Sequence, residues 1–184
     1  MSLITTLKHL YLRERERGGD EFEQCVFRIA LLLLFAIFLI GDDAWNNSFG
    51  RHSAALYLAA AYLLVSAGML YSIHRSPARS PIRHTIAMVT DIAATTACIH
   101  LAGSSGSIFY AVYLWVTIGN GFRYGLPYLY MGMGLSIVGF ALLFAFSEFW
   151  RQNPEFSAGL LIGLIILPLF FSLLVRRLNQ AIRR

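Results

Sequence analysis

One acidic residue lies inside an apolar run of the sequence. Asp91 stands in the middle of residues 82–102, between Thr90 and Ile92. Within a membrane a charged carboxylate costs several kcal/mol unless it is paired or protonated, so Asp91 should face the interior of a helix bundle. Two roles stay open. The carboxylate either makes a polar contact to a ligand or serves as a protonation site, or it accepts a hydrogen bond from Thr, Tyr or Asn of another helix.

A second group of polar residues lies in residues 110–125, which read YAVYLWVTIGNGFRYG. Three glycines, one Asn and one Arg within residues 119–125 would be costly on a lipid-facing helix, so this stretch should be buried in protein or break the helix. It predicts either a tight hairpin, with Pro127 as a favourable helix start, or the polar floor of a cavity. The candidate ligand contacts here are Trp115, Asn120, Arg123 and Tyr124.

An acidic cluster stands just before the first apolar run. Gly18 and Gly19 precede it and predict a hinge, because glycine tolerates backbone conformations that other residues avoid. Residues 3–17 combine apolar side chains at helical spacing with basic residues, which predicts an amphipathic helix in the headgroup plane. The segment is either a plain interfacial anchor or a signal-responsive element. The acidic residues of the cluster are Asp20, Glu21 and Glu23.

The sequence lacks the motifs of soluble enzymes. GxxxxGK[ST], HExxH and GxSxG are all absent. Cys25 and Cys98 lie in or at the edge of apolar runs and the five histidines are scattered, so we expect neither a disulfide framework nor a metal site. We therefore expect residues 1–184 to contain no catalytic residue and no cofactor, and not to be an enzyme by themselves.

The composition indicates a protein that crosses a membrane several times. Hydrophobic residues make up 57% and charged residues 14%, whereas soluble domains average about 45–50% and about 25%. Runs near the roughly 20 residues that a spanning helix needs predict an all-α membrane bundle of about six transmembrane helices, with five possible. The expected spans are residues 25–41, 54–73, 82–102, 108–118 extending to 121, 128–146 and 158–175. The chain divides into a juxtamembrane segment (1–24), a sensor bundle (25–175) and the start of a cytoplasmic signalling helix (176–184).

The basic residues predict the orientation, because Lys and Arg concentrate in cytoplasmic loops. With six spans and both termini inside, 12 of the 15 Lys and Arg fall on the cytoplasmic side, 2 fall outside, and Arg28 lies near the membrane edge. A five-span arrangement with an external N-terminus would put Arg75, Arg79 and Arg83 on the outer side. The basic excess thus belongs to membrane topology, and we expect no nucleic-acid partner.

Residues 110–125, with Asn153-Pro154, residues 159–171 and residues 174–184, resemble one known family. They are similar to the N-terminal membrane input domain of the RpfC-type hybrid sensor histidine kinases. These are bacterial receptors for diffusible signal factor, a cis-2-unsaturated medium-chain fatty acid. The resemblance extends from about residue 20 to residue 184 and is strongest in YAVYLWVTIGNGFRYG; Asp91 after Met88 also fits.

The resemblance implies a longer parent in the bacterial inner membrane. Such a parent autophosphorylates on His, uses ATP and Mg in a kinase domain absent from residues 1–184, dimerises, and signals to a response regulator. In the family the acidic segment before the first span is implicated in sensing, and the matching positions here are Asp20, Glu21 and Gln24, with Glu21 the best-aligned acid. The family is usually drawn with five spans and that segment outside, whereas the charge count favours six spans with it inside.

Two other classes of function stay open. Asp91 and the polar interruption at residues 119–127 would also suit a small transporter or channel subunit, although no inverted repeat is visible. The other class is a passive membrane anchor and dimerisation module.

For a fatty acid receptor, each CH₂ of the ligand buried in the bilayer contributes about 0.8 kcal/mol to membrane binding, so the ligand collects in the bilayer. Its carboxylate partners would be Arg28, Arg123, Asn120 or Tyr124 on the inner side, and Arg51, His52 or Arg151 on the outer side.

Overall fold

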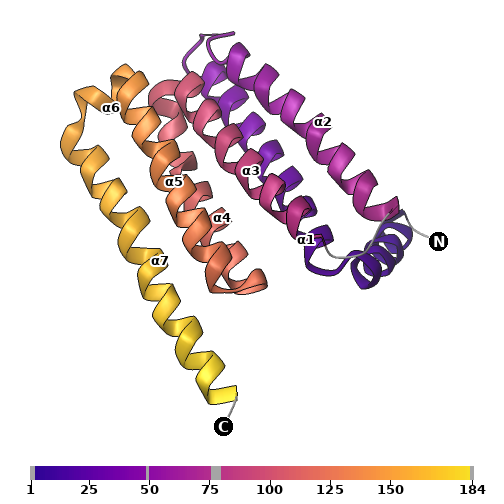
Figure 1. The fold of residues 1–184 in the computed structure, drawn as a ribbon. Coiled ribbons are helices and arrows are strands. Elements are labelled where there is room, and N and C mark those ends of the chain that lie inside the picture. The colour runs from indigo at the N-terminus through magenta and orange to yellow at the C-terminus, as the bar shows by residue number, and fades with distance from the viewer. Residues whose placement is uncertain (1–2, 49, 76–79, 183–184) are drawn as a thin grey trace.

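The computed structural model describes residues 3–48, 50–75 and 80–182, and the regular elements within them are all helical (Figure 1). In chain order they are α1 (Leu3–Trp45), α2 (Ser53–Arg75), α3 (Pro81–Ala102), the 3₁₀ helix η1 (Gly103–Tyr110), α4 (Ala111–Tyr124), α5 (Leu126–Phe146), α6 (Glu148–Gln152) and α7 (Pro154–Ile182). Together with the apolar runs, this confirms the predicted all-α membrane bundle. The chain is a multi-pass membrane protein.

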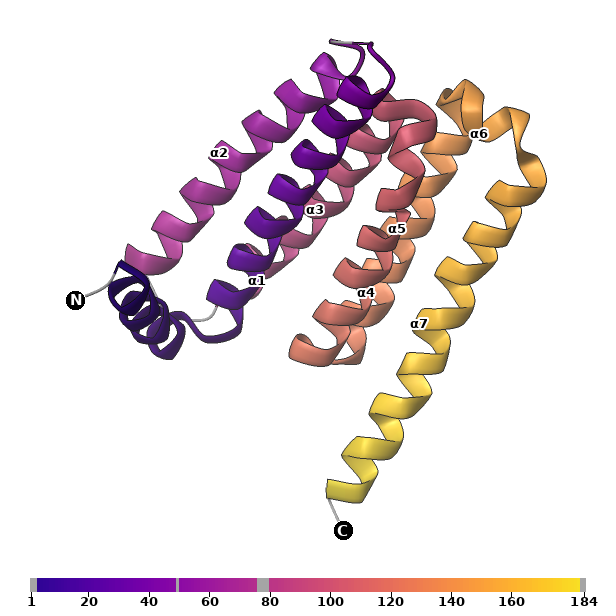
Figure 2. The same ribbon diagram turned by 180° about the vertical axis from the view of Figure 1, so that it is seen from behind.

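Five helical segments are long and apolar enough to cross a membrane. They are Glu21–Trp45, Ser53–Arg75, Pro81–Tyr124, Leu126–Phe146 and Pro154–Arg177. The third segment is 44 residues long and folds back at η1, so that α3 and α4 run in opposite directions (Figures 1 and 2). The chain therefore passes through the bundle six times, and α1 and α7 have their free ends on the same side of it.

The fourth pass differs in detail from the one expected at residues 108–121. The α-helix begins at Ala111 and continues to Tyr124, so Asn120 and Gly121 lie within an unbroken helix. Its 14 residues rise only about 21 Å, short of a hydrocarbon core about 30 Å thick. The preceding η1 is Gly- and Ser-rich, and its steeper 3₁₀ rise extends the pass with few residues.

Local backbone signals set the ends of the helices near one end of the bundle, called here the Gly125 end. Gly125 has φ 93°, a conformation that favours glycine, and it separates α4 from α5. Ser80 caps α3, with its side chain accepting from the Arg83 N–H, and Pro81 follows at the first helical position. Gly19 has φ 53° and breaks α1, so the first part of α1 turns across the bundle (Figure 2). The side chains before Gly19 lie outside the described residues, and their amphipathic role stays a prediction.

The bundle consists of two packed groups that share α3. Phe35, Leu39, Ala55, Ala59, Cys98 and Ala102 form a small core between α1, α2 and α3. A larger core joins α3, α4, α5, α6 and α7 around Met88, Ile99, Tyr113, Phe140, Trp150 and Leu164. Phe109 of η1 packs against both cores. The two groups therefore meet along a seam between α1 and α4, with α3 behind it.

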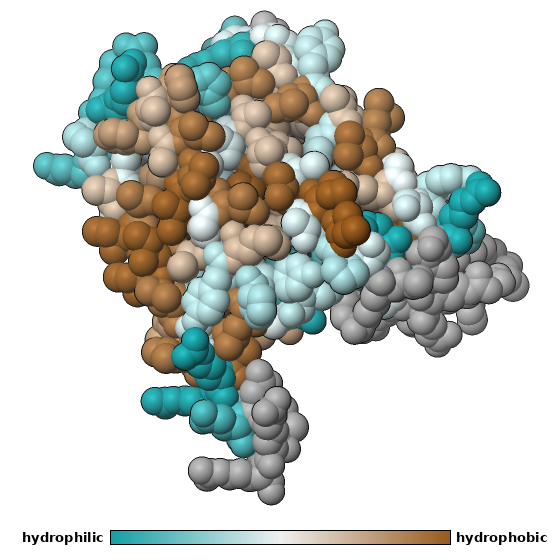
Figure 3. Space-filling model, in the orientation of Figure 1, coloured by the Kyte–Doolittle hydropathy of each residue, from teal (hydrophilic) through white to brown (hydrophobic). Residues whose placement is uncertain are grey.

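Polar contacts close the opposite end of the bundle, called here the η1 end. The His52 ring lies with Nδ1 2.6 Å from Asp43 Oδ1, and Ser105 Oγ donates to Asp42 Oδ2 at 2.8 Å. These contacts tie the end of α1 to the start of α2 and to η1. Between the two polar ends, apolar side chains cover much of the visible face of α5 and α7 (Figure 3), as expected for a surface in contact with lipid.

Candidate ligand-binding site

A buried ion pair joins α1 to α3 in the interior of the bundle. Arg28 Nη2 donates to Asp91 Oδ2 at 2.8 Å, and Arg28 Nε donates to Asp91 Oδ1. Each residue is only 7% exposed. The hydroxyl of Tyr62, on α2, donates to Asp91 Oδ1 at 2.5 Å. Asp91 therefore faces the interior, as predicted, and its partners connect three helices.

Sequence reasoning considered a Tyr partner for Asp91 but missed Arg28. A signal was available, because Arg28 and Asp91 are opposite charges that both lie inside apolar runs. Two such charges gain by pairing, since each alone has a large desolvation cost. The predicted start of the membrane helix at residue 25 placed Arg28 near the membrane edge, so it did not indicate that Arg28 reaches the depth of Asp91 in the membrane. The apolar segment in fact begins at Glu21, which places Arg28 two turns inside it.

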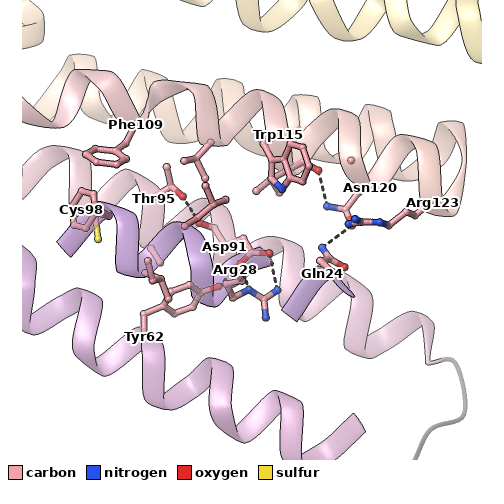
Figure 4. Close-up of a pocket in the computed structure, with 17 residues that line it drawn as sticks. Gln24, Arg28, Tyr62, Asp91, Thr95, Cys98, Phe109, Trp115, Asn120 and Arg123 are labelled. Atoms are coloured by element: carbon pink, nitrogen blue, oxygen red, sulfur yellow. Dashed lines mark hydrogen bonds and ion pairs between the residues drawn. The ribbon is translucent and has the colours of Figure 1, made fainter. Parts of the chain in front are cut away.

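A cavity lies along the seam between α1 and α4 and includes this ion pair (Figure 4). Its free volume is about 70 Å³. The polar side chains that line it lie at the middle and toward the Gly125 end: Gln24, Arg28, Tyr62, Asp91, Asn120 and Arg123. Apolar side chains line the part toward the η1 end: Leu31, Leu32, Phe35, Cys98, Phe109 and Val112. The cavity is thus polar at one end and apolar at the other.

Side chains alone bridge α1 and α4 across the cavity, because their backbones scarcely pack against each other. At the Gly125 end, Gln24 Nε2 donates to Asn120 Oδ1 and the Tyr124 hydroxyl donates to Gln24 Oε1, both at 3.2 Å. Farther along, the rings of Phe27 and Trp115 lie 4.9 Å apart. Trp115 lines the cavity and is 42% exposed, so its ring lies between the cavity and the lipid-facing surface, and Phe27 packs against it from α1.

The structure brings most of the candidate residues together. Six of the nine line the cavity: Gln24, Arg28, Asp91, Trp115, Asn120 and Arg123. Tyr124 contacts the cavity residue Gln24. The side chain of Asp20 lies outside the described residues. A ligand-binding role for all of these residues stays a prediction.

Glu21 lies away from the cavity, in a buried cluster of its own. Its carboxylate forms an ion pair with Arg83, and its Oε1 lies 3.3 Å from His84 Nε2 and 3.4 Å from the Ser80 N–H donor. The cluster fastens the start of the first membrane helix to the N-terminus of α3, where the helix dipole favours a negative charge. A sensing role for Glu21 would therefore act through the position of α1 relative to α3.

Sequence reasoning also missed several cavity residues. Tyr62, Thr95 and Cys98 read as ordinary members of apolar helices, and Phe35 and Phe109 as ordinary core. Which face of a membrane helix meets a cavity depends on how the helices rotate against each other, and uniformly apolar runs carry no periodic signal for that rotation.

Comparison with known proteins supports the resemblance found in the sequence. The chain is 36% identical over 168 residues, 91% of its length, to the sensory/regulatory protein RpfC from two strains of Xanthomonas campestris pv. campestris. The match covers 23% of those proteins, so the chain spans about a quarter of the length of the curated relatives it matches. No family model matches, and no solved structure matches. The resemblance to RpfC-type sensory/regulatory proteins that residues 110–125 predict is therefore confirmed, and it extends over nearly the whole chain.

Proposed function

We propose that this chain is the membrane input segment of an RpfC-type sensor histidine kinase. The observation that carries the proposal is the similarity to sensory/regulatory proteins over 91% of the chain. The parent is proposed to be a dimer in the bacterial inner membrane, with the free ends of α1 and α7 on the cytoplasmic side. It autophosphorylates on His, using ATP and Mg bound outside residues 1–184, and passes the phosphoryl group to a response regulator.

The proposed signal is a cis-2-unsaturated medium-chain fatty acid. Two features of the bundle support an amphiphile of this kind: a cavity with one polar and one apolar end, and a partly exposed aromatic ring, Trp115, that lines the cavity at the lipid-facing surface. A fatty acid concentrates in the bilayer, so a receptor can collect it from the side.

Helix α4 connects the cavity to α7, which continues unbroken to Ile182. One face of α4 carries Asn120 and Arg123 into the cavity. On another face, the Phe122 ring packs edge-on against Phe171 of α7, with centroids 5.6 Å apart. A ligand that favours one position of α4 over another would therefore shift α7, and a difference of about 1–3 kcal/mol is enough for a clear switch.

Autophosphorylation of the full-length parent in liposomes tests the proposal. We expect the rate to rise at least about fivefold with a cis-2-unsaturated acid, the low end of typical allosteric coupling, and to rise much less with a saturated acid of equal length. A parent that is equally active with and without every acid tested would contradict the sensing function and favour a passive anchor. Acid-dependent ion or solute flux in vesicles without a kinase response would favour a transporter.

The contact between α4 and α7 gives a separate prediction. Phe122→Ala and Phe171→Ala should each reduce the fatty acid-stimulated rise in autophosphorylation several-fold while leaving ligand affinity nearly unchanged, because neither ring lines the cavity. Radiolabelled acid binding and kinase assays on the same liposomes measure both quantities. Phe144→Ala, at an exposed phenylalanine of α5, is the matched control and should change neither. Equal loss of binding and response in the Phe122 and Phe171 variants would show that the contact supports the fold and does not transmit the signal.

A further inference from the structure

We infer that the seam cavity binds a single-chain acid in one fixed direction, with the carboxylate on Arg123 and the chain lying along α4 toward Phe109. This inference rests on the proposed function, since it names the site and the orientation of that ligand. It assigns the headgroup to a residue on α4 and not to the acidic segment before the first span.

The charges of the cavity favour an anionic ligand. Two guanidinium groups, of Arg28 and Arg123, and one carboxylate, of Asp91, line it, which leaves one positive charge in excess. Arg28 and Asp91 satisfy each other through two hydrogen bonds. Arg123 is half-buried and forms no hydrogen bond or ion pair with any residue in the described part of the chain. A partly buried cation gains most from an anion that brings acceptor oxygens, and a carboxylate matches the guanidinium fork.

The polar side chains near Arg123 at this end of the cavity carry no charge that would neutralise it. Asn120 Nδ2 donates to the Val116 carbonyl at 2.6 Å, and its Oδ1 accepts from Gln24. The Tyr124 hydroxyl donates to Gln24. These neutral groups are engaged with each other and with the backbone, so they hold the floor of the cavity in shape. Using Arg28 as the receiving group would require breaking its bonds to Asp91, which makes Arg123 the better headgroup partner.

The cavity matches one medium-length chain in length but is narrower than such a chain. Lining residues extend from Arg123 to Val112 on α4 and from Gln24 to Phe35 on α1, each about 16 Å at 1.5 Å per residue. A free volume of about 70 Å³ has room for a few water-sized groups, far less than the two chains of a phospholipid need. An acyl chain therefore has to push α1 and α4 slightly apart, and this links occupancy to the position of α4.

A photoreactive fatty acid with a diazirine near the end of its chain tests the inference on the full-length parent in liposomes. We expect saturable labelling of peptides that contain Phe35, Cys98 or Phe109, at the apolar end. Arg123→Gln should weaken competition by the unlabelled acid roughly 10- to 100-fold, the range for a lost hydrogen-bonded charge, and Arg123→Lys should weaken it less. Arg75→Gln, at an exposed arginine at the end of α2, is the matched control and should leave affinity unchanged.

The methyl ester of the same acid gives a test that needs no variant to fold. It should compete at least about tenfold less well than the acid with the wild-type protein, because an ester carries no charge for Arg123 to bind. Labelling confined to residues 20–24, or an Arg123→Gln variant that binds the acid normally, would overturn the inference. If the kinase still responded to the acid, the proposed function would stand. Competition by anionic phospholipid equal to that by the acid would identify a resident lipid and also overturn it. Absence of both labelling and kinase response would contradict the proposed function itself.

Discussion

Asp91→Ala is expected to destabilise the bundle by roughly 3–5 kcal/mol, the usual cost of removing one partner from a buried ion pair. The substitution leaves the Arg28 guanidinium buried without its two acceptors, and it also removes the acceptor of the Tyr62 hydroxyl. Arg28→Ala should have a similar cost, because it leaves the carboxylate of Asp91 charged in an apolar surrounding. Reversible unfolding of the detergent-solubilised protein, followed by circular dichroism, measures both losses.

The double variant Arg28→Met with Asp91→Leu separates the ion pair from the packing. Removing both charges and replacing them with apolar side chains of similar size should recover most of the lost stability, because a buried pair is often no better than a hydrophobic replacement. A double variant as unstable as the sum of the single losses would show that the two residues act independently. Asp91→Asn is a milder comparison, since it keeps the Tyr62 contact and removes only the charge.

The membrane helices could be predicted from the sequence because their signals are long and local. Residues 54–73 and 82–102 differ from α2 and α3 by at most two residues at each end. The fourth pass was harder, since η1 is a 3₁₀ helix rich in Gly and Ser and its residues carry no strong hydropathy signal. The folding back of a 44-residue apolar segment depends on packing between α3 and α4, which hydropathy does not encode.

The candidate site was predictable where a residue is chemically out of place in a membrane. Arg28, Asp91, Asn120 and Arg123 are all polar side chains in apolar surroundings, and the bundle turns all four toward one cavity. Apolar cavity residues such as Phe109 carry no such signal. The position of Glu21 shows the reverse case, because an acidic residue that looked available for a ligand is engaged with Arg83 and His84. Only the packing of α1 on α3 reveals that engagement.

The second large effect on stability is expected at Gly121, where α4 packs closely against α5. A Cβ added there would meet the side chain of Leu129, including its Cβ at 2.8 Å, an atom that cannot swing away. Gly121→Ala should therefore force α4 and α5 apart and destabilise the protein by about 1–3 kcal/mol, the typical cost of overpacking. It should also weaken ligand binding, because Asn120 and Arg123 lie on either side of it in sequence.

Gly119 offers a matched control one position before Asn120 on the same helix. Apart from its own helix backbone and its chain neighbours, no atom lies within 4 Å of the place where its Cβ would be, so Gly119→Ala should be neutral or stabilise the protein by about 0.4–1 kcal/mol, as alanine restricts the unfolded chain. The same substitution two residues apart is thus expected to change stability in opposite directions. Thermal unfolding of both variants in detergent decides the matter. Equal changes in their midpoints would mean that α4 and α5 are not in close contact at Gly121, and the floor of the cavity would then have to be built differently.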